Sequence, residues 1–326
     1  MSAAPRRQRG IALLVALLTV ALAAILIAGL LDRGELALAR TRNALRTEQA
    51  QAYAQGLESY AAQILMKDYS DDSAVDTNTD IWALPLPPQQ VPGGIISGTA
   101  RDLNGCFNLN NLSRASTGNQ AWFDVFARLL KVQGVAPDVA DAVREWLDDE
   151  SGADSNDTYY LSLPVPYRRG RHTFAHVSEL RLVRGVTSEV YAQLAPYVCA
   201  LPPGTKINVN TASVPVLQSL GEISKAQAEN LWQNGKAHWS GTFQQEWQQK
   251  DIRIDPRLGQ NHLGTASSYF LARGDITLDG IAFTFYSLIE RRTGPDGGIR
   301  VLERSRGSDD ALVAAVVPEQ ASAAAR

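Results

Sequence analysis

The sequence is poor in the residues that carry most metal-binding and redox chemistry. It holds two cysteines, four histidines and two methionines in 326 residues. Two cysteines cannot build a zinc cluster or a disulfide framework. The 31 basic and 34 acidic residues leave a net charge of -3, so no overall positive field exists to attract nucleic acid. No nucleophile elbow, phosphate-binding glycine loop or paired-carboxylate signature occurs, and we therefore expect no enzyme.

The apolar residues are spread unevenly and gather near the N-terminus. Hydrophobic residues make up 45% of the chain and charged residues 20%, which excludes wholesale disorder and a polytopic membrane protein. Residues 11–31 carry no charge, and only Thr19 among them is polar. At about 1.5 Å per residue, such a helix can cross a hydrocarbon core of about 30 Å. The preceding arginines predict a cytoplasmic N-terminus, with the chain after Asp32 across the membrane; they are Arg6, Arg7 and Arg9.

Three interpretations of this segment stay open. It is a plain signal anchor, a secretory signal peptide cut near Ala28, or a prepilin-type leader of residues 1–10 cut between Gly10 and Ile11. The third is favoured, because a small residue at the cytoplasmic face leaves the bond open to a membrane-embedded peptidase. The helical period continues past the apolar stretch, which predicts one helix from residue 11 to about residue 66. A long helix after an Arg-Gly leader resembles the type IV pilin and pseudopilin families.

The rest of the chain alternates between strand and helix patterns. Residues 68–98 are rich in Asp, Ser, Thr, Pro and Gly and predict a loop, and 95–110 predict a hairpin that turns at Asn104-Gly105. Helical stripes follow between 112 and 263, with Thr211 and Ser224 as expected N-caps. The two-residue period then returns and predicts strands over 268–278, 281–292 and 299–304, the last two joined by a turn over 294–297. The expected divisions are 1–10, 11–31, 67–111, 112–263, 264–306 and a disordered tail over 307–326.

This order predicts an α+β fold in which one antiparallel sheet is interrupted by a large inserted all-α domain. The early strands need partners to be stable, and those partners come after the helical block. The predicted architecture therefore has a long N-terminal transmembrane helix, a sheet made from both ends of the remaining chain, and helices between them.

Polar clusters offer three candidate sites. Five carboxylates lie within ten residues and could form a solvated loop or supply oxygen ligands to calcium; they are Asp148, Asp149, Glu150, Asp154 and Asp157. His172 and His176 stand four apart and could share a helix face, but no third zinc ligand is evident.

The phrase INVNTA at residues 207–212 resembles the opening of helix-hairpin-helix modules, where a helix N-terminus meets phosphate. The alternative function is therefore a membrane-anchored periplasmic DNA-binding protein, which the lack of a basic patch disfavours. If the segment has a structural role and binds no DNA, Asn208 and Asn210 form hydrogen bonds with the backbone of a turn and Thr211 caps a helix.

Several phrases in order resemble general secretion pathway protein K, the K family of minor pseudopilins of the type II secretion system. They are RRQRGIALLVALL, DLNGCFNLNNL, REWLDDESGADSNDTYY, HVSELRLVRGV, KINVNTASVPVLQSL and SSYFLARGDITLDG. The resemblance covers nearly the whole chain to about Arg306. It implies a pseudopilin fold with an inserted helical domain, and a subunit at the tip of a periplasmic filament that primes assembly for export of folded proteins across the outer membrane. The implied partners are minor pseudopilins of the I and J types, the major pseudopilin, a prepilin peptidase and a methyltransferase, with the chain in the inner membrane and its bulk in the periplasm.

The resemblance also gives meaning to single residues. Most pseudopilins carry glutamate at the fifth position after the cleavage point, and here that position is Val15. A carboxylate in an apolar bundle is costly unless paired, and its absence suits the first subunit, which has no earlier neighbour. The family also implies calcium binding in the acidic loop, although GADSND stands where a tighter Gly-Ala-Glu-Asp is expected. Cys106 and Cys199 would lie in the periplasm, where disulfides persist, and both the bridged and the free state stay open.

Overall fold

The computed structural model describes residues 8–71, 75–148, 157–292 and 297–307, and it consists of two compact units. The first unit, residues 1–53, contains the larger part of helix α1 (Gln8–Asp71). This helix runs beyond the expected end near residue 66. Its apolar part is unbroken because isolated glycines such as Gly29 and Gly34 weaken a helix without ending it.

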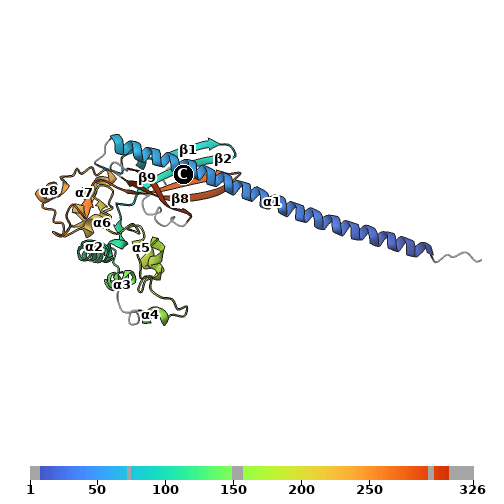
Figure 1. Ribbon diagram of the computed structural model, residues 1–326, viewed down its shortest axis with the longest axis horizontal. Helices are drawn as coiled ribbons and strands as arrows, with labels where there is room; N and C mark the ends of the chain where they lie inside the picture. The colour runs from blue at the N-terminus through green and yellow to red at the C-terminus, as the bar shows by residue number, and fades with distance from the viewer. Residues whose placement is uncertain (1–7, 72–74, 149–156, 293–296, 308–326) are drawn as a thin grey trace, which may run out of the picture. The chain divides into compact units, whose positions relative to one another are not determined.

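The second unit, residues 54–326, contains the end of α1, a five-stranded sheet and a group of helices (Figure 1). The sheet is antiparallel in the order β1-β2-β7-β8-β9. Its strands are β1 (Leu86–Val91), β2 (Gly94–Asp102), β7 (Tyr269–Leu278), β8 (Ile281–Arg292) and β9 (Gly298–Arg306). The predicted α+β class is thus confirmed, and so are the three C-terminal strands. Residues 293–296, where the turn between the last two strands was expected, lie outside the described ranges.

Apart from α1 and the 3-10 helix η1, which precedes β1, the described helices lie in the chain between β2 and β7. The α-helices are α2 (Asn119–Val132), α3 (Asp138–Leu147), α4 (Thr158–Leu161), α5 (Ser188–Leu194), α6 (Val214–Ser219), α7 (Lys225–Trp232) and α8 (Phe243–Gln249). Four 3-10 helices accompany them in the described ranges: η1 (Ile81–Ala83), η2 (Leu109–Leu112), η3 (Val177–Leu182) and η4 (Gln233–Gly235). The apolar faces of α2 to α8 meet in one core that includes Trp122, Phe126 and Trp146, whereas Trp82 of η1 packs against Phe270 of β7. Figure 1 shows this group gathered away from the strands of the sheet.

The inserted domain is not purely helical, contrary to the expectation. Two pairs of two-residue strands run parallel to one another: β3 (Phe107–Asn108) with β4 (Val198–Cys199), and β5 (Ile207–Asn208) with β6 (Leu263–Gly264). Such short pairs carry no readable period in the sequence. Strand β3 lies where the chain enters the inserted domain and β6 where it leaves, so the two pairs hold both ends of the domain in place.

Two local predictions were wrong, for identifiable reasons. The first hairpin is β1 with β2 across Pro92-Gly93, not a turn at Asn104-Gly105. Strand β1 was read as loop because it contains Pro87 and Pro88, which an edge strand tolerates at a bulge. Gly105 is required for a close approach, because a Cβ there would lie 2.6 Å from the Thr211 carbonyl oxygen.

Candidate functional site

The apolar part of α1 is the first candidate site. Among the described residues, α1 is long and apolar enough to cross a membrane, and its most apolar 18-residue window has a mean hydropathy of 3.0 with no residue buried. Ile11 is 64% exposed and Val15 is 54% exposed. An exposed apolar surface of this length needs a lipid or protein environment. Gly10 lies within the helix, one residue before Ile11.

The end of α1 is held on one face of the sheet. Leu57 packs over the two glycines Gly98 and Gly274, and a Cβ at Gly274 would come within 2.9 Å of the Leu57 side chain. Beside it, the Glu58 carboxylate accepts hydrogen bonds from Arg304 at 2.8 Å and from Ser287 at 2.7 Å. Burial would raise the pKa of Glu58, but these hydrogen bonds and the Arg304 charge lower it overall. The small sheet residues and this ion pair fix the helix against β7, β8 and β9.

A buried polar group joins the sheet to the inserted domain. We call it the junction cluster, and it consists of Asp76, Asp102, Asn208, Ser267 and Arg291, each at most 5% exposed. Asp102 ends β2, Arg291 lies on β8, and Asn208 belongs to β5 of the inserted domain. The Asn208 amide donates to the Asp76 carbonyl oxygen at 3.0 Å and to the Ser267 hydroxyl at 2.7 Å. The cluster therefore links three segments that are far apart in the chain.

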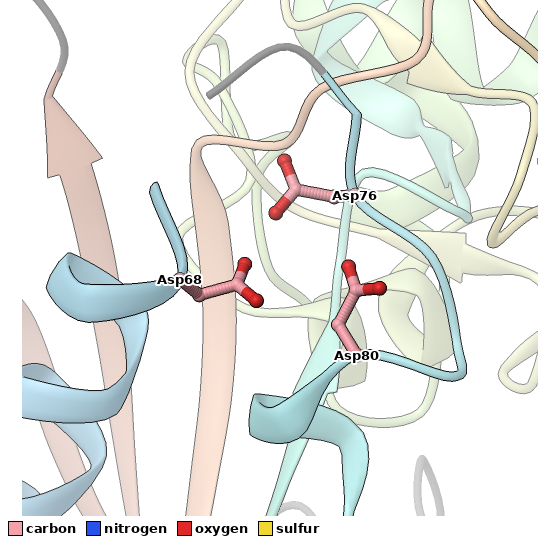
Figure 2. Close-up of side chains that lie close together, drawn as sticks. All are labelled: Asp68, Asp76 and Asp80. Atoms are coloured by element: carbon pink, nitrogen blue, oxygen red, sulfur yellow. The ribbon is translucent and has the colours of Figure 1, made fainter. Parts of the chain in front are cut away.

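Three aspartates gather at the Arg291 end of this cluster, and Figure 2 shows their side chains. Carboxylate oxygens of Asp68, Asp76 and Asp80 lie within 4.8 Å of one another. Arg291 donates to both oxygens of Asp76, at 2.6 and 2.5 Å, and its other terminal nitrogen is 3.6 Å from Asp68. Burial raises the pKa of Asp76, while the charge and hydrogen bonds of Arg291 oppose that rise. A guanidinium thus already neutralises these carboxylates in part, so their grouping alone does not indicate a metal site.

The INVNTA segment is buried in the same region. Asn208, Val209 and Asn210 have no exposed surface. Asn210 donates to and accepts from the Trp239 backbone, at 3.1 and 2.6 Å. Both asparagines therefore bond the backbone, as expected. Thr211 is not a helix cap, since Ser213 precedes α6 and the Thr211 hydroxyl donates to the Asp102 carboxylate instead. Apart from the half-buried Thr211, the segment is buried and offers little surface to a phosphate, so the geometry does not support DNA binding.

The two cysteines meet beside this junction. The structure joins Cys106 and Cys199 in a disulfide with a Cα–Cα distance of 5.9 Å, and the bridge closes a sequence separation of 93 residues. Both are buried with Leu103 and Leu201 against Leu271 of β7. A covalent tie and a polar tie therefore hold the inserted domain to the sheet.

The comparisons with known proteins agree with this architecture. A family model described as "Type II secretion system (T2SS), protein K" matches residues 105–203. The type II secretion system protein K of Pseudomonas aeruginosa is 33% identical over 318 residues, covering 93% of this chain and 94% of that protein. The chain belongs to the protein K family of the type II secretion system.

Other members of the protein K family support the same assignment. The protein of Pectobacterium carotovorum is 37% identical over 246 residues, which cover 70% of this chain and 75% of that protein. A chain in the crystal structure of the GspK-GspI-GspJ complex from enterotoxigenic Escherichia coli is 30% identical, with a TM-score of 0.71. The match covers 82% of this chain and 99% of that one. Family and fold together make this chain a minor pseudopilin, anchored to a membrane by its apolar helix.

Within this protein K chain, the predicted calcium ligands are only partly described. Asp149, Glu150 and Asp154 lie outside the described residues. Asp148 is 3.3 Å from Arg114. Asp157 is buried, with one oxygen 3.0 Å from Arg169 and the other 2.7 Å from Arg171. Both carboxylate oxygens of Asp157 thus bind arginines, and calcium binding by this set of residues stays a prediction.

The histidines do not form the helical pair that their spacing allowed. His176 caps η3, where its ring accepts from the Ser178 backbone, and His172 lies in the preceding loop. Sequence reasoning missed the junction cluster altogether. Asp76 and Arg291 are separated by 215 residues, and no local period or spacing signals such a contact. The one available signal was Asn208 itself, a polar residue between the apolar Ile207 and Val209.

Proposed function

We propose that this minor pseudopilin forms the tip of a periplasmic pseudopilus with minor pseudopilins of the I and J types. There it primes polymerisation of the major pseudopilin, which drives export of folded proteins across the outer membrane. The similarity to a chain solved together with GspI and GspJ supports these partners. In this role the chain acts as a structural subunit. The observation that carries the tip position is the uncharged stretch of α1 over residues 11–31, with Val15 where most pseudopilins have a carboxylate.

A substitution at Val15 tests the tip position. A glutamate there needs a positive N-terminus from an earlier subunit, because an unpaired charge within a membrane helix is costly, up to about 2.5–3.5 kcal/mol at the helix centre. We expect Val15→Glu to reduce secretion of exported proteins in a complementation assay, with Val15→Ala as the tolerated control. Full secretion by Val15→Glu, with the protein present at wild-type level, would argue against the first position.

The proposal includes maturation by a prepilin peptidase between Gly10 and Ile11, followed by methylation of the new N-terminus. Removing residues 1–10 takes away three arginines and no acid, which leaves 28 basic and 34 acidic residues and a net charge of -6. Mass spectrometry of the N-terminal peptide should find methylated Ile11, and Gly10→Leu should accumulate uncut precursor. A mature protein that begins at Met1 or near Gly29 contradicts this step. Inner-membrane insertion with the bulk periplasmic follows from the same basic leader, and labelling of an added cysteine at residue 307 in whole cells tests it.

We also propose that any calcium bound by the acidic loop is held through Asp148 and not through Asp157. The two arginines at Asp157 would have to leave before a cation could approach, whereas Asp148 contacts the more exposed Arg114. Calcium should raise the melting temperature of the full chain, and Asp148→Asn should reduce that rise. The same rise in Asp148→Asn as in the wild type, or no rise in the wild type, contradicts the proposal.

A further inference from the structure

The Asp102 side chain is the only carboxylate in the described residues that joins the sheet to the INVNTA segment. Its first oxygen accepts from the Asn104 backbone at 2.7 Å. Its second oxygen accepts from the Ser267 hydroxyl at 2.6 Å, from the Asn208 amide at 3.3 Å and from the Thr211 hydroxyl. All four donors are neutral. The carboxylate is thus removed from water without a cation in hydrogen-bond contact.

The charges around Asp102 are mostly negative. Asp76 lies on the other side of Ser267, and Asp68 and Asp80 lie beside Asp76. Arg291 binds Asp76 directly, whereas Arg101, the neighbour of Asp102 in the chain, donates to the Pro196 carbonyl oxygen at 3.1 Å and acts on Asp102 through its charge. Asp102 thus lies close to a group of three aspartates in which Arg291 contacts Asp76 and Asp68. Such a surplus of negative charge favours uptake of a proton by the carboxyl group with the least access to a cation, which is Asp102.

The geometry can accommodate that proton without leaving a polar group unsatisfied. A hydroxyl either donates or accepts, as its hydrogen can rotate. When Asp102 is protonated, its O–H can donate to the Thr211 oxygen. The Thr211 hydroxyl can then turn toward the Asn208 carbonyl oxygen, which lies 3.5 Å away. Ser267 and Asn104 keep their existing bonds to the carboxyl group.

We propose that the junction cluster is a proton-dependent contact between the sheet and the inserted domain. It is tight while Asp102 is protonated, and it opens locally when ionisation of Asp102 draws water to the buried charge. Burial raises the pKa of Asp102 to about 6, against the hydrogen bonds from Ser267, Thr211 and Asn104 that lower it. Ionisation of Asp102, and with it the local opening of the contact, is therefore expected between mildly acidic and neutral pH. This inference rests on the geometry of the cluster and not on the tip role proposed above.

Hydrogen exchange of the full chain in detergent micelles, followed by mass spectrometry between pH 4.5 and 8, tests this proposal. After correction for the intrinsic pH dependence of exchange, peptides covering residues 205–212 should lose protection as pH rises through about 6. Asp102→Asn, which cannot ionise, should keep the same protection throughout. Asp275→Asn is the matched control, because Asp275 also lies on the sheet but is 38% exposed and pairs with Arg273; its profile should match that of the wild type.

A second variant keeps the test decisive if Asp102→Asn does not fold. Thr211→Val nearly preserves side-chain volume but removes the hydroxyl that donates to the ionised carboxylate and accepts from the protonated one, so the midpoint of the protection loss should move. A wild-type profile without a midpoint between pH 5 and 7 overturns the proposal. So does an unchanged midpoint in Thr211→Val, because another group would then be titrating.

Discussion

Two buried aspartates, one inside the inserted domain and one at its junction with the sheet, show that burial alone does not set the charge of a carboxyl group. Asp157 is 2% exposed and contacts two arginines, whereas Asp102 is 5% exposed and contacts only neutral donors. Burial raises both pKa values, but Arg169 and Arg171 lower that of Asp157 below its ordinary range, while that of Asp102 rises to about 6. The nearest cation decides the outcome.

The two residues therefore make stability depend on pH in opposite directions. The contribution of Asp157 is present above its ordinary pKa and is lost as pH falls through its lowered value. The contribution of Asp102 is complete below its ordinary pKa and is lost as pH rises through about 6. Both contributions coexist only in a mildly acidic window, between about pH 4 and 6.

The largest effect should come from breaking the Asp157 pair. Arg169→Met leaves a buried carboxylate with one of its two arginines, and loss of a buried partner typically costs about 3–5 kcal/mol. Denaturant unfolding at pH 7, followed by tryptophan fluorescence, measures the change. Arg184→Met is the matched control, because its pair with Glu145 is 43% and 33% exposed and should contribute less than about 1 kcal/mol. Equal losses in both variants would remove the distinction between the two environments.

Opening the disulfide should give the next largest effect. Replacing Cys106 and Cys199 by serine frees a loop of 93 residues, and such bridges typically contribute about 2–4 kcal/mol. The double variant should unfold at lower denaturant, and alkylation without reductant should modify neither cysteine of the wild type. Modification of both wild-type cysteines in the folded chain would show that the bridge does not form.

The sign of the Asp102 effect should depend on pH. At pH 7.5, Asp102→Asn should stabilise the chain by about 1–3 kcal/mol, because it removes an ionised group from a buried site. At pH 4.5 the gain should vanish, since the wild-type carboxyl group is then protonated. Thermal unfolding at both values measures the difference, and destabilisation at pH 7.5 that exceeds that at pH 4.5 would reverse the assigned direction.

The smallest effect on stability is expected at the ion pair between Glu58 and Arg304, because its arginine is exposed. Glu58→Gln removes the charge that Arg304 meets on β9; the arginine is 60% exposed and the glutamate 11%. Solvent screens such a pair, so the loss should be below about 1 kcal/mol. Unfolding at low and high salt should show that wild type and variant converge as ionic strength rises. A loss as large as that of Arg169→Met would mean that exposure does not govern these pairs.

Local sequence patterns predicted the parts of the fold that depend on neighbouring residues. The apolar run of residues 11–31, the stripes of α2 and α3 and the alternation of β7 and β8 each bury or expose one face, so their periods are readable. Strand β1 was missed because proline suppressed its signal. The contacts of Asp102 with Thr211 and Ser267, 109 and 165 residues away, follow from tertiary topology and leave no local trace. The identity of the family was predictable because several unusual phrases occur together in one order.

The order of strands in the sheet has a consequence for biogenesis. Strand β2 pairs with β7, so that Ile96 faces Ile276 across the whole length of the insertion. Contacts between residues so far apart in the chain form slowly, and during synthesis from the N-terminus the early, local units fold first. The helical core can therefore mature while β2 still presents an unpaired edge, and the sheet closes only when the last forty or so described residues emerge. A chain that stops before Tyr269 would keep its apolar helix and the helices of the inserted domain, but it would lack the strands against which the end of α1 packs. Only a chain that includes the C-terminal strands can therefore complete the sheet of the subunit.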